Sequence, residues 1–236
     1  IGACDWSSDV CSSDLAQVRV TYIAMLLMAG TAVLGRVISF FDTSGFLVPV
    51  AAAGILFAIL VNSRAGALFS LLTALLVSIQ FGYDWRVFVV QAAMGVAGVF
   101  AIYKVRRRSD MTTACVQAAV AGLVAAFAVT LALGSLASES ALRQLMLVGL
   151  NGVVCVFVVP GLLPTLEKWF NVTTDIQLLE YSDLNNPLLA KLALEVPGTF
   201  SHSLMLGQLA EAAADAIGAN GLKARVCAYY HDIGKM

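Results

Sequence analysis

The last residues of the chain, AYYHDIGKM, place a histidine, an aspartate and a lysine close together: His231, Asp232 and Lys235. The chain has one other histidine, His202. Adjacent side chains on a helix point about 100° apart, so His231 and Asp232 can converge on one metal ion near a helix end. With His202 supplied by a packed helix, imidazole and carboxylate ligands would suit iron, manganese or zinc. A chance His-Asp pair and a buried core histidine explain the same residues, so the spacing alone leaves both interpretations open.

Two helical segments should position these residues. The stretch PGTFSHSLMLGQLAEAAADAIGANG begins with a Pro-Gly break, offers Thr199 as a helix cap and ends in Gly and Asn. Leu206 and Leu209 recur at helical spacing from His202, which predicts that the histidine points into an apolar face. The next helix should start near Leu222 and carry small side chains beneath His231.

The composition of the chain indicates a membrane protein. Hydrophobic residues make up 60% of it and charged residues 12%, against about 25% charged in an ordinary soluble domain. The mean hydropathy is +0.87. No basic patch suggests nucleic-acid binding. The five cysteines form no CxxC pair, so neither a disulfide framework nor a thiolate zinc site is indicated.

Six apolar runs approach the length of about 20 residues that a spanning helix needs. The second and third are short and separated only by NSR, which predicts a tight helical hairpin. Pro160 and Pro164 predict a kink where the last run ends. The six expected spans are Val20–Phe41, Phe46–Val61, Ala65–Phe81, Arg86–Tyr103, Met111–Gly134 and Leu142–Leu163.

Basic residues predict the orientation of these spans, because short cytoplasmic loops are rich in Lys and Arg. The strongest such loop is KVRRR, Lys104 to Arg108. Placing it inside also places Arg19, Arg64 and Lys168 inside, and leaves three arginines outside, Arg36, Arg86 and Arg143. The polar tail after Leu163 should then be cytoplasmic.

The tail also resembles a known family. His202, His231, Asp232 and Lys235, in the stretch LLEYSDLNNPLLAKLALEVPGTFSHSLMLGQLAEAAADAIGAN and then ARVCAYYHDIGKM, look like the opening of an HD-domain phosphohydrolase of the seven-transmembrane HD family. The resemblance is close over residues 176–236 and looser upstream. It implies an all-α fold, in which a polytopic helical membrane domain precedes a cytoplasmic all-helical HD domain, in the inner membrane of a bacterium.

The resemblance also implies a function, the hydrolysis of cyclic di-AMP to linear pApA by two divalent metal ions, iron or manganese. His202, His231 and Asp232 fall on metal-ligand positions, with Asp232 bridging the ions. Lys235 would offset charge on the phosphate oxygens. The partners implied are the cyclic dinucleotide and the lipid bilayer, with no nucleic acid, and the oligomeric state stays open. A sensory membrane or extracytoplasmic region would regulate the enzyme.

The family pattern predicts that this chain is truncated at both ends. Further metal ligands are expected beyond Met236, and one span and an outer domain are expected upstream, so we expect these residues alone to be inactive. The expected domains are 16–164 for the membrane region, 165–186 for a juxtamembrane linker and 187–236 for the start of the HD domain. Residues 1–15 resemble translated sequencing-adapter sequence, although a native acidic tail would read similarly.

Two other functions remain open at this level. The HDIGK motif also occurs in the HD-GYP branch, whose members hydrolyse cyclic di-GMP. A receptor or transporter with a non-catalytic tail is the alternative outside enzymes. The spans lack paired intramembrane carboxylates and an obvious half-repeat, which argues against transport.

Overall fold

The computed structural model describes residues 6–102, 108–134, 139–170, 172 and 174–236. Every regular element in these residues is a helix, as the all-α prediction requires. The chain divides into two compact units, Ile1–Val172 and Thr173–Met236. Residues Lys104 to Arg107 of the KVRRR loop lie outside the described residues.

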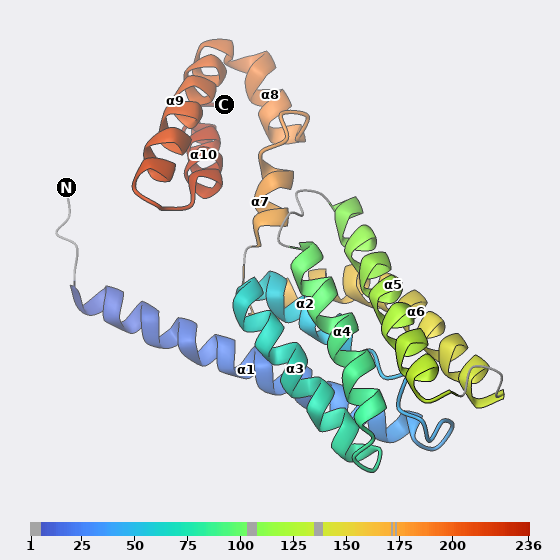
Figure 1. Cartoon of the computed structure of the whole chain (residues 1–236). Helices are drawn as coiled ribbons and strands as arrows, with labels where there is room; N and C mark the ends of the chain where they lie inside the picture. Colours follow the sequence, from blue (N-terminus) through green and yellow to red (C-terminus); the bar gives the residue numbers. More distant parts are fainter. Residues whose placement is uncertain (1–5, 103–107, 135–138, 171, 173) are drawn as a thin grey trace. The chain divides into compact units, whose positions relative to one another are not determined.

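The first unit is a bundle of apolar helices (Figure 1). Along the chain, α3 packs against α4, α4 against α5, and α5 against α6. Within the described residues, five helices are long and apolar enough to cross a bilayer, and they confirm five of the six expected spans. The six helices of the unit are α1 (Trp6–Ile38), α2 (Val50–Leu60), α3 (Ser63–Gln80), α4 (Trp85–Ile102), α5 (Arg108–Ala132) and α6 (Glu139–Phe170).

The second expected span, Phe46–Val61, is wrong as a span. Its helix, α2, has 11 residues, which is about 16 Å at 1.5 Å per residue against a hydrocarbon core of about 30 Å. Pro49 precedes the helix and limits it, because proline restricts the residue before it to extended backbone. All of α2 except Ile59 is buried, so it is a core helix of the bundle. The predicted hairpin is confirmed: Asn62 accepts a hydrogen bond from the amide of Arg64 at 3.0 Å and starts α3.

The irregular segment before α2, Gly45 to Pro49, lies inside the bundle, and three of its backbone carbonyls are paired with side-chain amides. The side-chain nitrogen of Gln91 on α4 lies 3.0–3.2 Å from the carbonyl oxygens of Gly45, Phe46 and Val48. That of Asn151 on α6 lies 2.8 and 3.0 Å from the carbonyls of Phe46 and Val48. Irregular backbone is tolerated at membrane depth only where such partners exist. Both amide side chains are fully buried.

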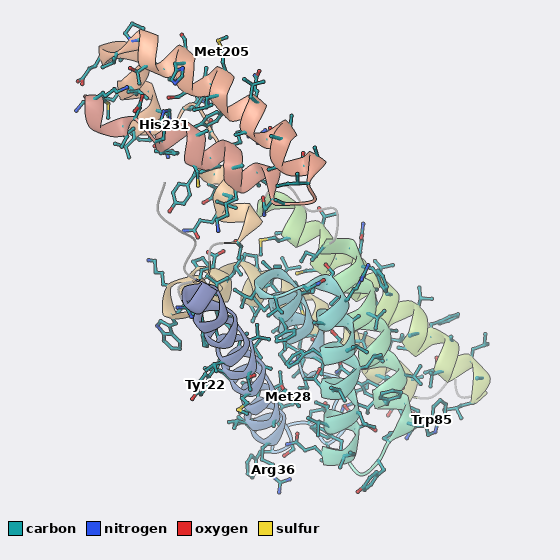
Figure 2. All side chains as sticks on the ribbon, turned by 90° about the vertical axis from the view of Figure 1, so that its left-hand side faces the viewer. Tyr22, Met28, Arg36, Trp85, Met205 and His231 are labelled. Carbon is teal, nitrogen blue, oxygen red and sulfur yellow. The ribbon has the colours of Figure 1, made fainter. Side chains whose placement is uncertain are left out.

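Small residues let the helices approach closely, as membrane helix interfaces require. A Cβ built on Gly66 would lie 2.5 Å from the Cβ of Ala58, and one on Gly152 would lie 2.3 Å from that of Ala119. Large apolar side chains instead cover the outside of the bundle. Tyr22 on α1, for example, is 62% exposed and points away from the other helices (Figure 2). The bundle therefore presents the apolar exterior of a lipid-embedded protein.

Two expected boundaries differ in the structure. Helix α6 continues through Pro160 and Pro164 to Phe170, so it does not end at Leu163, where the last span was expected to end. Residues 165–186, expected as a linker, hold the end of α6 and a short helix, α7 (Asp175–Tyr181). At the other end of the chain α1 begins at Trp6, and its candidate span begins at Val18.

The second unit contains α7, α8 (Pro187–Glu195), α9 (Pro197–Ala216), α10 (Gly221–Tyr230) and the 3₁₀ turn η1 (Ile233–Lys235). Asn186 and Asn220 cap α8 and α10 through their side chains. The expected cap at Thr199 is wrong. Helix α9 starts at Pro197, so Thr199 lies inside its first turn, because proline at the first helical position has a suitable φ and needs no amide partner.

Candidate metal centre

The structure brings His202, His231 and Asp232 together. His202 lies in the second turn of α9, and His231 follows the last residue of α10. Asp232 comes next and precedes η1. One ligand atom from each residue lies within 4.8 Å of the others. Among the described residues this is the one group of three or more His, Cys, Asp or Glu that could hold a metal ion.

The two imidazole rings face each other at an angle. Their centroids are 5.7 Å apart and their planes are inclined by 60°. Nδ1 of His231 lies 2.7 Å from the carbonyl oxygen of Ala228. With Nδ1 donating to that carbonyl, Nε2 is left as the acceptor that a metal requires. This Nε2 lies 3.4 Å from Oδ2 of Asp232, so the two atoms can share one ion.

Asp232 is prepared as an anionic ligand. The ammonium group of Lys235 donates a hydrogen bond to its Oδ2. This bond, with smaller contributions from the charges of His231, Lys235 and His202, lowers the pKa of Asp232 below its usual value. Its carboxylate is therefore ionised at neutral pH and available to a cation. Lys235 occupies the same oxygen, so it and a metal ion compete for it.

Both histidines are exposed, which corrects the expectation that His202 points into an apolar core. That expectation assumed a buried face on α9, whereas Leu209 is 69% exposed. Met205, on the same helix, is 67% exposed (Figure 2). A buried core histidine is therefore not the explanation for His202 or His231, since both are exposed. Exposed nitrogen atoms next to an ionised carboxylate do suit a metal centre open to solvent.

Contacts that the sequence did not predict hold α10 in place beneath the site. A Cβ on Gly207 of α9 would lie 2.4 Å from Cε1 of Tyr229, so the tyrosine ring packs directly on the α9 backbone. Arg225 forms a 2.8 Å ion pair with Glu211 of α9. The hydroxyl of Tyr230 donates to the Tyr181 carbonyl at 3.0 Å. A mid-helix glycine followed by an aromatic residue on the next helix was the available signal.

The donor set fits one divalent ion. Two imidazoles and a carboxylate are a common ligand set for iron, manganese and zinc, with positions left for water or substrate. Ligand distances near 2.1 Å put neighbouring ligands of a tetrahedral ion about 3.4 Å apart. Nε2 of His231 and Oδ2 of Asp232 already have this spacing, and closing the remaining spacings, of up to 4.8 Å, takes side-chain movements of about 1 Å. Lys235 adds a positive charge beside the same carboxylate.

Comparison with known proteins gives the chain two family matches. Residues 13–174 match the model of the 7TM receptor with intracellular HD hydrolase, and residues 199–236 match the HD domain. No solved structure matches the chain.

Curated relatives agree with these matches. The chain is 36% identical over 202 residues to the cyclic-di-AMP phosphodiesterase PgpH of Bacillus subtilis, covering 83% of this chain and 28% of that protein. It is 32% identical over 200 residues to PgpH of Listeria monocytogenes, covering 80% and 27%. An uncharacterised protein of Synechocystis, slr0104, is 43% identical over 97 residues, covering 41% and 12%. The chain thus spans little more than a quarter of the length of the two PgpH proteins.

Proposed function

Because this chain belongs to the family of 7TM receptors with an intracellular HD hydrolase, we propose that it is part of a membrane-bound phosphodiesterase that hydrolyses cyclic di-AMP. The reaction adds water across a phosphodiester bond. The hydroxide joins phosphorus, the 3′ oxygen leaves with a proton, and linear pApA results. The names of the two PgpH relatives support this substrate over cyclic di-GMP.

The observation that carries the proposal is the convergence of His202, His231 and Asp232 within 4.8 Å. His202 lies on α9 and His231 at the end of α10, so their nearness depends on the packing of these two helices and not on closeness in the sequence. Their exposure leaves room for a dinucleotide phosphate. A non-catalytic tail would have no need to keep two solvent-exposed imidazoles beside an ionised carboxylate.

Each residue has a proposed role. Nε2 of His231, a nitrogen of His202 and Oδ2 of Asp232 would hold a divalent ion, manganese or iron, and Asp232 would be the ligand shared with a second ion. Bound metal supplies Lewis acidity toward the phosphate and lowers the pKa of water. The carbonyl of Ala228 keeps the His231 tautomer fixed. Lys235 moves from Asp232 to the phosphate oxygens and offsets their charge.

We place the second unit in the cytoplasm of a bacterial cell. Basic residues are concentrated in and near the KVRRR loop, and the positive-inside rule assigns that loop to the cytoplasm. Helices α5 and α6 then return the chain to the same side before Thr173. A cytoplasmic site is also where a cyclic dinucleotide would be encountered.

The test uses the protein at the full length of its curated relatives, purified in detergent with manganese. Cyclic di-AMP and cyclic di-GMP are supplied separately, and linear products are separated by chromatography. We expect cleavage of cyclic di-AMP in preference. The His231→Ala protein should not retain manganese, and its turnover should fall by at least about 100-fold. Mutating residues that only hydrogen-bond to metal ligands already changes activity by about 10- to 100-fold.

Glu195→Gln is the matched control. It removes one carboxylate of the same unit, whose only partner in the described residues is Lys191 at 3.7 Å. Normal manganese content and normal turnover are expected. A His231→Ala protein that keeps its metal and activity would overturn the metal site. A preference for cyclic di-GMP would overturn the substrate.

A further inference from the structure

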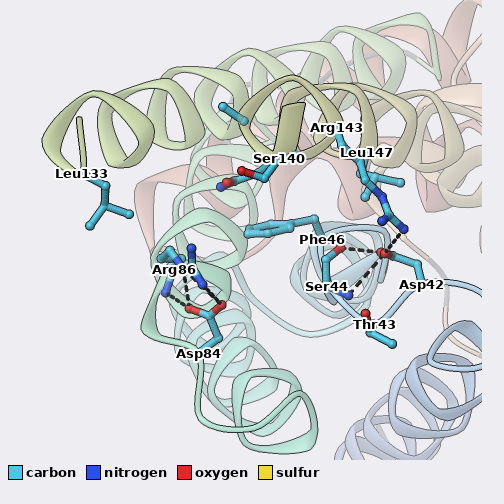
Figure 3. Close-up of a pocket in the computed structure, with 12 residues that line it drawn as sticks. Asp42, Thr43, Ser44, Phe46, Asp84, Arg86, Leu133, Ser140, Arg143 and Leu147 are labelled. Carbon is cyan, nitrogen blue, oxygen red and sulfur yellow. Dashed lines mark hydrogen bonds and ion pairs between the residues drawn. The ribbon is translucent and has the colours of Figure 1, made fainter. Parts of the chain in front are cut away.

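A polar cavity of about 300 Å³ lies at one end of the membrane bundle, far in sequence from the metal centre. It is lined by the segment that follows α1, by the start of α4 and by the first turns of α6 (Figure 3). We call this end of the bundle the pocket end. The α4–α5 connection, which includes KVRRR, leaves from the opposite end of α4.

Two ion pairs stand on opposite sides of the cavity (Figure 3). Arg143 Nη2 lies 3.2 Å from Oδ1 of Asp42, whose side chain is 5% exposed. The backbone amide and hydroxyl of Ser44 also donate to Asp42. On the other side, Nε of Arg86 donates to Asp84 at 3.0 Å and Nη2 lies 3.0 Å from its second oxygen.

Gln144 is the unexplained residue of this cavity. It lines the space and is only 8% exposed. Its side-chain nitrogen is buried and has no hydrogen-bond partner among the described residues. A buried amide donor left without an acceptor is unfavourable, and native proteins rarely keep one without a reason. A bound acceptor group would satisfy it.

The hydrogen-bonding balance of the walls defines that acceptor. The carboxylate of Asp42 is engaged by three donors, whereas Arg143 uses one of its nitrogens on it and a guanidinium carries five N–H groups. Arg143 is 64% exposed, so the remaining N–H groups are accessible. Next to it, both N–H groups of the Gln144 amide are unused. The walls therefore have spare donors, and their two carboxylates are already engaged.

We propose that the pocket end binds a small organic monocarboxylate. Arginine recognises carboxylates through two parallel N–H groups, and the Gln144 amide supplies a further donor. Each wall arginine is already balanced by an aspartate, which disfavours a ligand with several negative charges. Phe46 and Leu147 give the cavity an apolar wall for a short hydrocarbon or aromatic group. A volume of about 300 Å³ is at the small end of ligand pockets.

The test uses 4-fluorobenzoate as the probe and the whole chain in a non-ionic detergent, with binding followed by fluorine NMR. 4-Fluorobenzyl alcohol has the same ring without the carboxylate, and inorganic phosphate is an anion without the ring. We expect the benzoate to bind saturably and the other two not to compete with it. Gln144→Met, which keeps the side-chain length, should weaken binding at least about tenfold.

The same variant provides a second readout of opposite sign. Gln144→Met removes an unpaired buried donor, so the unliganded chain should melt at a higher temperature than the wild type, while benzoate no longer raises its melting temperature. Gln117→Met, on an exposed position of α5, should change neither quantity. Arg143→Lys keeps a charge beside Asp42 but loses the planar fork, and it should also bind about tenfold more weakly.

Three results would overturn the proposal. The first is no saturable binding of benzoate to the wild type. A second is unchanged affinity in both Gln144→Met and Arg143→Lys. Displacement of benzoate by phosphate at equal concentration would show that the site selects charge, not a carboxylate on an apolar group.

Discussion

Replacing Gln91 by methionine and Asn151 by leucine, singly and together, tests how the bundle holds a non-helical segment at membrane depth. Both replacements keep approximate volume and remove only the amide. Gln91 is the donor to the Gly45 carbonyl, and both amides donate to the carbonyls of Phe46 and Val48. The two side chains are therefore partly redundant, and redundancy predicts that their effects on stability are not additive.

The size of the effect follows from counting carbonyls that lose every partner. Gln91→Met leaves only the Gly45 carbonyl unpaired, at a cost of about 1–3 kcal/mol. The unpartnered Oε1 of Gln91 disappears as well, which places the net cost in the lower half of that range. Asn151→Leu leaves no carbonyl unpaired, because Gln91 still donates to the two that it shares, and should cost about 0.5–1.5 kcal/mol.

The double variant leaves the Phe46 carbonyl unpaired in addition to that of Gly45. The Val48 carbonyl keeps the amide of Val50 at 2.8 Å. One extra unpaired carbonyl makes the double variant less stable than the sum of the singles by about 1–3 kcal/mol. The unfolding free energy of each chain would be measured by titrating SDS into detergent micelles and following helical circular dichroism. Additivity within about 0.5 kcal/mol would refute the redundancy argument.

Three further predictions concern the second unit and the orientation of the chain. Gly207→Ala places a Cβ 2.4 Å from a ring carbon of Tyr229 and should destabilise the second unit by about 1–3 kcal/mol. A Cβ at Gly198 meets nothing within 4 Å, so Gly198→Ala should leave the melting temperature unchanged, and thermal melting compares the two variants. Lys235→Met removes the hydrogen bond that competes with a metal ion for Asp232 and a positive charge near that ion, so calorimetry should show roughly fivefold tighter manganese binding. Weaker binding would contradict the idea that Lys235 and the metal compete for the carboxylate. The exposed Cys227 should react with an impermeant maleimide only in permeabilised cells. The new thiol of Tyr83→Cys should react with the same reagent in intact cells. The opposite labelling pattern would reverse the predicted orientation.

The long spans were predictable because each is a continuous apolar run, and hydropathy detects such runs without any knowledge of packing. The fate of Phe46–Val61 was not predictable in this way. A hydropathy sum counts Phe46 to Pro49 as membrane residues. It does not register that Gln91 and Asn151, far along the chain, provide hydrogen bonds to this non-helical backbone. Isolated amide residues in apolar runs were the signal that could have indicated such an arrangement.

The candidate metal centre was predictable as a set of residues but not as an environment. The His-Asp pair and the helical punctuation before His202 indicated which side chains would meet. The burial of His202 was inferred from a repeat of leucines, and that inference failed because one helix face does not show whether another element covers it. The polar cavity was missed altogether, since Asp42 and Arg143 are 101 residues apart and their pairing depends on the packing of the whole bundle.

The carbonyls held by Gln91 and Asn151 impose an order on biosynthesis. Val48 is 103 residues ahead of Asn151, so the segment before α2 leaves the ribosome long before its second amide partner exists. At about 5–20 residues per second, that wait is roughly 5–20 seconds. Gln91 of α4 supplies the first donors earlier, 43 residues after Val48, and Asn151 adds its own only when α6 is made. The segment should therefore remain at the membrane surface or within the insertion machinery until α4 is made, and it gains its full set of partners only when α6 packs against it, as one of the last steps of assembly.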